Sequence, residues 1–332
     1  MSYDKDRVTH KLQVTCGVPQ GSILGPLLFL IYVNDLFAAS KILSPIMFAD
    51  DTNLFYADRN IEKLFEIVNA ELKNITEWFR ANKLSLNVKK TKYLLFHSQT
   101  KKITTSLPKI TMDSIEIQRE YSTKFLGIIL DESLSWKIQT ENVNKKVSKG
   151  IRLLYSARPY LTKNLLTQMY YAFVHCHINY CNIAWGSTHK SKLEPLHRKQ
   201  KHAVRIINQR DRMTHTEPLF QNLKILNIFA LNIFQTLCLM YKCREKQGPR
   251  IFHNVFTLKS HGKYSIRTSQ KTVAEPISHR SYELFSFSHR GPRLWNKFVA
   301  KNNVLLNTAS FYAFKKNLKV LLLKQKDFST IY

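Results

Sequence analysis

The chain has 332 residues, of which 44% are hydrophobic, and its 51 Lys and Arg against 23 Asp and Glu give a formal net charge of +28. This composition excludes an acidic disordered chain, a collagen-like repeat and a disulfide-rich miniprotein. A positive charge of this size on a folded chain indicates a polyanionic partner, with nucleic acid as the first candidate and an anionic membrane surface as the second.

The charge is unevenly distributed along the chain. Residues 1–136 hold 17 basic and 15 acidic residues, a net charge of +2, whereas residues 137–332 hold 34 and 8, a net charge of +26. The first part is suited to carboxylate chemistry and the second to a long basic binding surface. The first ten residues are polar, and the longest apolar run, residues 23–33, is shorter than the roughly 20 residues of a membrane span. We expect an intracellular protein, nuclear or cytoplasmic, with no signal peptide or transmembrane segment.

Three of the nine glycines, Gly17, Gly21 and Gly25, fall within nine residues around the sequence GVPQGS. Glycine permits positive φ and close approach to the backbone, and the proline between the first two fixes φ. A tight loop here can present backbone donors to a phosphate-bearing ligand, although a helix-capping turn also accounts for the pattern. Residues 24–33 are apolar on nearly all sides, which predicts a helix buried at the centre of the fold.

The sequence IMFADDTNLFY, residues 46–56, places apolar residues on both sides of two aspartates. This pattern predicts two short strands joined at an acidic turn. Adjacent carboxylates repel each other, and a divalent cation such as Mg²⁺, which prefers oxygen ligands, offsets that repulsion. An ordinary surface turn is the alternative interpretation.

Residues 60–83 carry apolar side chains at intervals of three and four, which predicts one amphipathic helix. Extended patterns follow at 84–87, 91–97, 109–117 and 124–130, the last around Gly127. This order indicates an α+β arrangement in which helices pack on one face of an antiparallel sheet.

After Trp136 the periodicity is helical. Apolar faces predict helices at about 143–154, 165–178, 191–208 and 223–243, followed by an irregular stretch at 249–289. The third of these helices has a basic face opposite its apolar one, made by Lys192, Arg198, Lys199, Lys201 and Arg205. A solvated helix surface is the alternative, but few acidic residues offset this charge, and we expect the face to contact phosphates.

The five cysteines do not have the paired spacing of a structural zinc site. His175, Cys176, His177 and Cys181 bring ligand types into one short stretch, but the apolar residues around them follow helical spacing. A core helix with free cysteines is therefore favoured over a metal site.

Four sequence motifs occur in order along the chain. They are GVPQGSILGP at 17–26, FADD at 48–51, the series W-x3-N-x-L-x-L-N-x2-K-T at 78–91, and FLGIILDESLSW at 125–136. Together they resemble the later palm motifs of reverse transcriptases, and more closely those of non-LTR, LINE-type retrotransposons of the jockey-like group. The resemblance continues through YCNIAWG at 180–186 and GPRLWN at 291–296, and covers nearly the whole chain.

The resemblance implies roles for individual residues. Asp50 and Asp51 correspond to paired metal carboxylates that hold Mg²⁺, or Mn²⁺ in its place, for two-metal phosphoryl transfer to a primer 3′ end. Lys90 matches a lysine that approaches the leaving pyrophosphate. The other positions are the loop beside the incoming nucleotide and template (Pro19, Gln20 and Gly21), the primer grip (Phe125, Leu126 and Gly127) and the basic thumb helix (Lys192, Arg198, Lys199, Lys201 and Arg205).

The resemblance also implies the fold and the order of domains. It predicts an α+β fold, with a partial right-hand polymerase palm at 1–136 that ends in the primer-grip segment. An all-α thumb at 137–245 then follows the sugar-phosphate backbone of the duplex, and 246–332 form a basic, mixed C-terminal extension.

One carboxylate of the resembled site has no counterpart in the sequence. In such polymerases a third carboxylate comes from a strand well upstream of the PQG loop, whereas only 16 residues precede Gly17 here. Asp4 and Asp6 lie too close to that loop to replace it. We expect a C-terminal piece of a reverse transcriptase, without fingers or the first catalytic aspartate motif, and inactive alone, so that whether the chain is an enzyme by itself stays open.

Three functions are open at this point. The first is the RNA-directed DNA polymerase fragment, whose partners are an RNA template, an RNA–DNA or DNA primer duplex and deoxynucleoside triphosphates, with no membrane and no specific protein partner indicated. The second is a non-catalytic basic nucleic-acid-binding protein derived from such an element. The third is a protein of anionic membrane surfaces, disfavoured because no basic helix has a large exposed aromatic face opposite its charges.

Overall fold

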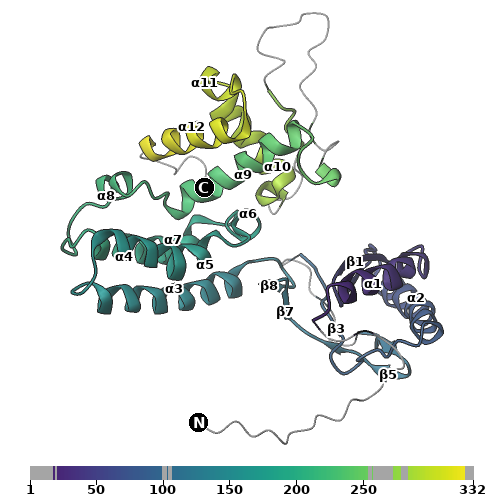
Figure 1. Ribbon diagram of the computed structural model, residues 1–332. Helices are drawn as coiled ribbons and strands as arrows, with labels where there is room; N and C mark the ends of the chain where they lie inside the picture. Colours follow the sequence, from purple (N-terminus) through teal and green to yellow (C-terminus); the bar gives the residue numbers. More distant parts are fainter. Residues whose placement is uncertain are drawn as a thin grey trace, which may run out of the picture. The chain divides into compact units, whose positions relative to one another are not determined.

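The computed structural model describes residues 18, 21–98, 103, 107–252, 256, 272–277 and 283–325. The chain divides into two compact units, residues 1–121 and residues 122–332, whose elements are labelled in Figure 1. Each unit has hydrophobic clusters of its own. The division differs from the predicted borders at 136 and 245, because the segment that contains the FLG turn packs with the helices that follow it.

The helices of the first unit are α1 at Leu24–Val33, a 3-10 turn η1 at Asn34–Ala38, and α2 at Ile61–Ala81. Asn60 caps α2, since its side chain accepts hydrogen bonds from the backbone amides of Glu62 and Lys63. The predicted amphipathic helix is confirmed, and its apolar face buries Phe65, Leu72 and Ile75. The Asn69 side chain ties the helix to the next strands by bonding the carbonyl of Lys109 and the amide of Thr111.

The strands of the first unit are short. They are β1 at Ser44–Phe48, β2 at Asp51–Phe55, β3 at Lys92–Tyr93, β4 at Thr111–Met112, β5 at Ile115–Glu116 and β6 at Gln118–Arg119. β1 pairs with β2 and β4 with β5 in antiparallel fashion, whereas β3 and β6 pair in parallel. The α+β mixture is confirmed, but the described strands form separate two-stranded sheets rather than one antiparallel sheet. Residues 84–87, predicted as extended, form no strand in the described structure.

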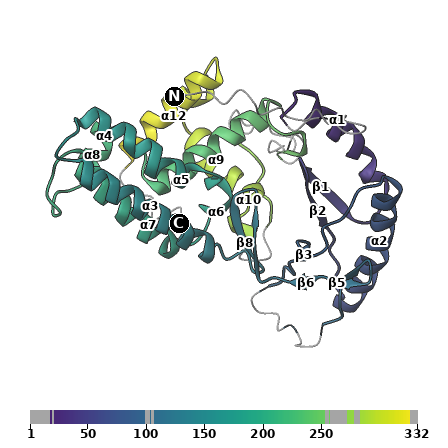
Figure 2. The same ribbon diagram turned by 60° about the horizontal axis from the view of Figure 1, so that its bottom comes forward.

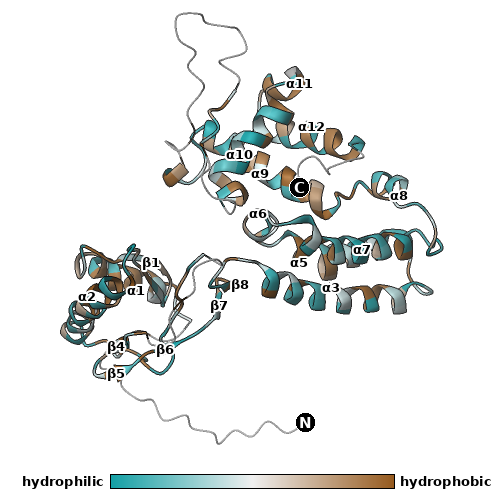
Figure 3. Cartoon of the chain, turned by 180° about the vertical axis from the view of Figure 1, so that it is seen from behind, coloured by the Kyte–Doolittle hydropathy of each residue, from teal (hydrophilic) through white to brown (hydrophobic). Residues whose placement is uncertain are grey.

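α1 is hydrophobic along nearly its whole length and is drawn largely brown in Figure 3. Within the described residues only Val33 of this helix is buried, and Leu24 and Ile31 are 61% and 65% exposed. The prediction of a centrally buried helix is therefore wrong for the described structure. An apolar pattern shows that a helix is suited to burial, but it does not supply the segment that covers it.

The second unit contains one hairpin and a set of helices (Figure 2). Its first elements are β7 at Ser122–Phe125, β8 at Ile128–Asp131, α3 at Lys137–Ala157, α4 at Lys163–Tyr170, a π-helical turn η2 at Tyr171–His175, α5 at Cys176–Asn179 and α6 at Asn182–Trp185. The later ones are α7 at Lys190–Ile207, α8 at Glu217–Asn222, α9 at Ile228–Arg244, η3 at Arg250–Phe252, η5 at Glu283–Phe285, α10 at Phe287–Leu294, a second π-helical turn η6 at Trp295–Val299, α11 at Asn303–Leu306 and α12 at Phe311–Lys324. The four predicted helices correspond to α3, to α4 through α5, to α7 and to α9.

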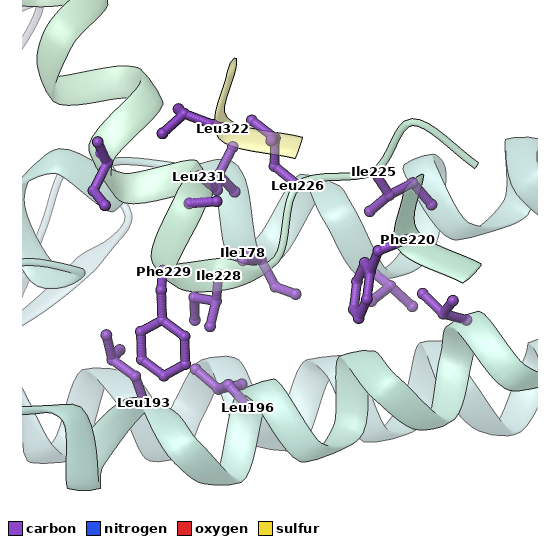
Figure 4. Close-up of a cluster of buried hydrophobic side chains, with 14 of the residues drawn as sticks. Ile178, Leu193, Leu196, Phe220, Ile225, Leu226, Ile228, Phe229, Leu231 and Leu322 are labelled. Atoms are coloured by element: carbon purple, nitrogen blue, oxygen red, sulfur yellow. The ribbon is translucent and has the colours of Figure 1, made fainter. Parts of the chain in front are cut away.

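One continuous hydrophobic cluster runs through the second unit, from Ile128 to Leu322. Figure 4 shows Leu193 and Leu196 of α7 beside Phe229 of α9 in this cluster. The buried Gln200 links the same helices, because its side chain donates to a backbone carbonyl before α9 and accepts from the first amide of α9. Burial of satisfied polar groups among apolar ones fixes which helix faces meet.

The described residues after 246 pack on α9 as part of the same cluster. Trp295 is 1% exposed and its ring stacks on that of Phe314 with centroids 6.1 Å apart. A Cβ added to Gly291 would lie 2.6 Å from the sulfur of Met240, so the GPRLWN sequence needs glycine for this close packing. Most of the irregular stretch predicted at 249–289 lies outside the described residues. Across the described ranges, no helix combines the length and apolar character needed to cross a bilayer.

Candidate active site and nucleic-acid interface

The acidic pair lies at the tip of the β1–β2 hairpin. Phe48 pairs with Asp51 across the ladder, and Ala49 and Asp50 form the connecting turn, with Ala49 at φ +52°. Both aspartates are exposed, and neither makes an ion pair within the part of the chain that the structure describes. The predicted acidic hairpin is confirmed, while the catalytic role of the two carboxylates stays a prediction.

Two adjacent carboxylates supply the hard oxygen ligands that Mg²⁺ prefers. Among the described residues, however, no group of three or more His, Cys, Asp or Glu side chains could hold a metal ion. Asp50 and Asp51 therefore fit a divalent ion in part, and its remaining ligands would have to be water, phosphate oxygens or carboxylates from elsewhere. Of the four residues in the short stretch of ligand types, Cys176 and Cys181 are exposed, and His175 and His177 are partly buried.

The glycine-rich loop is described only in its second half. Pro19 and Gln20, both predicted to contact nucleotide or template, lie outside the described residues. Gly21 has φ +85°, with open space where a Cβ would be. This is a conformation that glycine adopts without strain, as expected for a tight loop. The Ser22 hydroxyl then accepts a hydrogen bond of 3.1 Å from the Gly25 amide and helps to start α1.

Lys90 lies in a turn between α2 and β3. Its backbone amide donates to the carbonyl of Asn87 at 3.0 Å, and the hydroxyl of Thr91 donates to the same carbonyl at 3.1 Å. The Lys90 side chain is exposed. The turn thus presents the ammonium to solvent, and its approach to pyrophosphate stays a prediction.

The FLG turn joins β7 to β8 in a two-residue hairpin. Phe125 pairs with Ile128, and the two turn residues, Leu126 and Gly127, have φ of +43° and +85°. Positive φ at both central residues is typical of the tight hairpin turns that match strand twist. The strand that follows the turn is held by α3, because the amide of Ile129 donates to the side chain of Gln139 at 2.9 Å. The sequence located this turn correctly, and its role as a primer grip stays a prediction.

Asp131, at the end of β8, organises the start of α3 and was not singled out from the sequence. Its carboxylate accepts hydrogen bonds from the Ser133 hydroxyl and the Ser135 amide, both 2.8 Å, and from the Trp136 amide at 3.0 Å. Burial alone would raise the pKa of Asp131, but these donors hold it below its ordinary value. An acid followed by two serines before a helix is the signal that could have indicated this cap.

Three of the five basic residues predicted to contact phosphates bind the protein itself. The Lys192 ammonium donates to the Ser135 carbonyl at 2.6 Å, that of Lys199 to the Asn144 carbonyl at 3.1 Å and to the Ser148 hydroxyl, and the Arg205 guanidinium to the Thr214 carbonyl at 2.9 Å. Burial lowers the pKa of both Lys192 and Lys199. These lysines therefore attach α7 to α3 and to the loop before it, and Arg198 is the fully exposed member of the predicted set, with Lys201 partly exposed.

A second basic surface lies on α3 and was missed in the sequence. Lys145, Lys149 and Arg152 are exposed at helical spacing, on the side of α3 away from its buried residues Val143, Val147, Ile151 and Leu154. Glu141 is the single acidic residue of this helix. The dense basic sequence KKVSKGIR at 145–152 was the available signal. We call the row formed by Lys145, Lys149 and Arg152 the α3 basic row.

Two histidines of the second unit are buried and low in pKa. The Nδ1 atoms of His175 and His197 are buried without a hydrogen-bond partner in the described structure. Burial, together with a nearby lysine in each case, lowers the pKa of both to about 4. Both rings are therefore neutral at pH 7 and belong to the apolar packing rather than to a charged binding surface.

Comparison with known proteins shows which family the first part of the chain resembles. Residues 2–130 match the model of the reverse transcriptase (RNA-dependent DNA polymerase) family. This stretch contains the acidic hairpin, Lys90 and the FLG turn described above. Residues 2–130 are similar to reverse transcriptases. The resemblance inferred from the four motifs is thereby confirmed.

The curated relatives of the chain are named as proteins of mobile elements. The chain is 26% identical over 233 residues to the probable RNA-directed DNA polymerase from transposon X-element of Drosophila melanogaster, covering 67% of this chain and 25% of that protein. It is 22% identical over 222 residues to the RNA-directed DNA polymerase from mobile element jockey of the same species, covering 64% and 24%. These names support a LINE-type reverse transcriptase. No solved structure matches the chain.

The aligned stretch in each relative is longer than the family match, so the similarity continues into the helical unit. The chain spans about a quarter of the length of the curated relatives it matches. The activity and substrates of a complete reverse transcriptase are therefore a matter of proposal for this chain.

Proposed function

We propose that this chain carries part of the active site and the duplex-binding surface of an RNA-directed DNA polymerase of a retrotransposon. The supporting observation is the exposed Asp50 and Asp51 pair at a hairpin tip inside the stretch that matches the reverse transcriptase family. In the whole protein the template is RNA, the primer strand is paired to it, and the substrates are deoxynucleoside triphosphates.

The first unit supplies the chemical groups in this proposal. Asp50 and Asp51 would contribute ligands to Mg²⁺, or to Mn²⁺ in its place, and such an ion would supply positive charge for the attacking hydroxyl and the triphosphate. Lys90 offers an exposed ammonium to the pyrophosphate that leaves. The loop at Gly21 presents backbone to the nucleotide and template. For this chain alone we propose no sustained polymerisation, because the described residues provide two carboxylates on one turn and no third ligand beside them.

The second unit supplies the grip on the duplex. The FLG hairpin holds the primer end, and the α3 basic row follows the sugar-phosphate backbone. The row is favoured over the α7 residues because Lys192, Lys199 and Arg205 are already hydrogen-bonded within the protein. A lysine or arginine that neutralises a phosphate releases counterions, so this binding weakens with salt and is nearly independent of sequence.

Manganese binding tests the metal site directly. Mn²⁺ should broaden the amide signals of residues 48–52 and no other cluster among the described residues, and Asp50→Asn with Asp51→Asn should abolish the effect. Asp211→Asn, at an exposed acidic position in the other unit, is the matched control and should leave it unchanged. Broadening that survives in the double variant would show that these carboxylates are not the metal ligands.

Primer extension on an RNA template with Mg²⁺ tests the second half of the proposal. The chain alone should bind the primer–template and give no sustained DNA synthesis. Synthesis that disappears in Asp50→Asn would contradict the inactivity and confirm the role of the carboxylate.

A second candidate function is a nucleic-acid-binding protein without chemistry. The observation that favours it is the same lack of a third metal ligand among the described residues, beside an exposed basic row on α3. It predicts duplex binding that is steep in salt and unaffected by metal or by Asp50→Asn. Mn²⁺ that increases duplex affinity in the wild type, but not in Asp50→Asn, would exclude it.

A further inference from the structure

The YCNIAWG sequence at 180–186 has no part in the proposed function so far, yet its first residue touches the FLG turn. The phenol of Tyr180 donates a hydrogen bond of 2.6 Å to the carbonyl of Leu126. The same ring lies against Gly127, where a Cβ would be 3.2 Å from Cε1 of Tyr180. The turn is therefore covered on one side by an aromatic ring, and glycine at 127 avoids both a tight contact with it and the strain of φ +85°.

Tyr180 is itself fixed in place by the core of the helical unit. Its carbonyl accepts a hydrogen bond of 2.8 Å from the indole of Trp185, a fully buried residue. Its amide donates to the carbonyl of Cys176 at 3.1 Å. Cys181, with φ +48°, turns the chain between α5 and α6. These contacts fix the backbone of Tyr180, and its ring, which is 51% exposed, is directed at the hairpin by its hydrogen bond to Leu126.

The next helix, α6, is also attached to the core by specific contacts at its first residue. Asn182 is fully buried, and its carbonyl accepts a hydrogen bond of 2.8 Å from the side chain of Asn232 in α9. A Cβ added to Gly186 would lie 2.5 Å from that same carbonyl of Asn182, which explains the final glycine of the sequence. The YCNIAWG segment is thus fixed by buried contacts and connects the core of the helical unit to Tyr180.

The hairpin is therefore held to the helical unit at two separate points. Tyr180 holds its turn, whereas β8 is held by Gln139 at Ile129 and by the Asp131 cap at its end. Both supports come from the second unit, in which the hairpin itself lies, and not from the unit with Asp50 and Asp51. Any motion of the helical unit would carry the turn with it.

We propose that Tyr180 is a positioning residue for the primer 3′ end, which acts by fixing the Leu126–Gly127 turn to the helical unit. The inference rests on the proposed function of that turn as a primer grip. Tyr180 contacts the turn and not the reacting atoms. Its phenolic hydrogen bond sets the direction of the Leu126 carbonyl, and its ring sets the height of the turn above the helices. The position of the primer end is then determined by the helical unit, which also holds the duplex.

The first test needs no nucleic acid. Tyr180→Phe removes the hydroxyl and keeps the ring against Gly127, and Tyr160→Phe, at a tyrosine 85% exposed, is the matched control. Amide hydrogen exchange at residues 126–128 should become about fivefold faster in Tyr180→Phe and stay unchanged in the control, since one hydrogen bond to the turn is lost. Unchanged exchange in Tyr180→Phe would overturn the proposal, whatever the turn binds.

The second test separates positioning from structural support. A primer–template with a photoreactive nucleotide at the primer 3′ end should crosslink to the 125–128 hairpin in the wild-type chain. Tyr180→Phe should lower that crosslink yield at least threefold while the duplex Kd changes less than twofold, and Tyr160→Phe should change neither. Yield and affinity that fall together would show a merely structural role and overturn the positioning claim.

The two tests also distinguish the inference from the function on which it rests. If exchange rises in Tyr180→Phe but the wild-type chain gives no hairpin crosslink, the primer-grip assignment is overturned, and the positioning role with it. If the wild-type chain crosslinks and Tyr180→Phe does so equally well, the primer grip stands and the role of Tyr180 is overturned.

Discussion

The two units of the chain differ in charge, in packing and in the chemistry they carry. Residues 1–121 hold 16 Lys and Arg against 13 Asp and Glu, a net charge of +3, whereas residues 122–332 hold 35 against 10, a net charge of +25. The first unit has small separate clusters and an exposed apolar helix, and the second has one continuous core. In the proposed function, the metal carboxylates and the duplex-binding surface therefore lie in different units.

The strongest test of this separation is to remove a core side chain from one unit. Trp185→Ala takes a fully buried indole from the second unit and should cost it about 3–5 kcal/mol of unfolding free energy. Hydrogen exchange should then show lost protection in α3, α7 and α9, with α2 unchanged. Phe65→Ala, in the first unit, should give the opposite pattern. Equal loss of protection in both units would mean that they unfold as one body.

The pH dependence of stability should belong to the second unit. His197 is 9% exposed between Phe220 and Phe229, and its folded pKa of about 4 is below the roughly 6.5 of an unfolded histidine. The unfolded chain therefore takes up the proton first as pH falls. The contribution of His197 to the free energy of unfolding is fully present above about pH 6.5. It decreases by up to about 3 kcal/mol as the pH falls towards 4.

Urea unfolding between pH 7 and pH 4 checks this expectation. His197→Leu should make the unfolding free energy fall less steeply as the pH decreases. His215→Leu, at an exposed histidine, should leave this pH dependence unchanged. An equally steep decline in His197→Leu would show that His197 does not cause it.

The Asp131 cap should contribute a smaller, acid-side effect in the same unit. Asp131→Asn removes acceptor capacity for the Ser135 and Trp136 amides and should cost about 2 kcal/mol at pH 7. Because the folded pKa of Asp131 is lowered, its contribution is present above the unfolded value of about 3.9 and is lost as pH falls through the folded value. Thermal unfolding from pH 7 to pH 3 measures this. A variant as stable as the wild type at pH 7 would contradict the cap.

The sequence predicted the features that depend on local pattern. The α2 helix followed from apolar spacing, and the acidic hairpin from apolar runs around Asp50 and Asp51. These predictions succeeded because a 3.6-residue repeat of apolar side chains, or an acidic turn between apolar runs, can be recognised without knowledge of any distant partner.

The features that the sequence did not show depend on distant partners. Lys192 and Lys199 lie on a basic face, but their acceptors, Ser135 and Asn144, are 57 and 55 residues away. Tyr180 is 54 residues from the Leu126 carbonyl that it contacts. A charge pattern shows that a face is basic, and only the packing of α7 on α3 decides which charges bind protein and which stay free for phosphates.

In the proposed function, the helical unit binds the duplex while the first unit holds the metal carboxylates. The most direct measurement is primer–template affinity as a function of salt concentration for the wild type and two variants. The slope of log K against log salt should become shallower by roughly 2 to 3 in the triple variant Lys145→Gln, Lys149→Gln, Arg152→Gln. It should not change in Asp50→Asn with Asp51→Asn. A slope unchanged in the triple variant would contradict the claim.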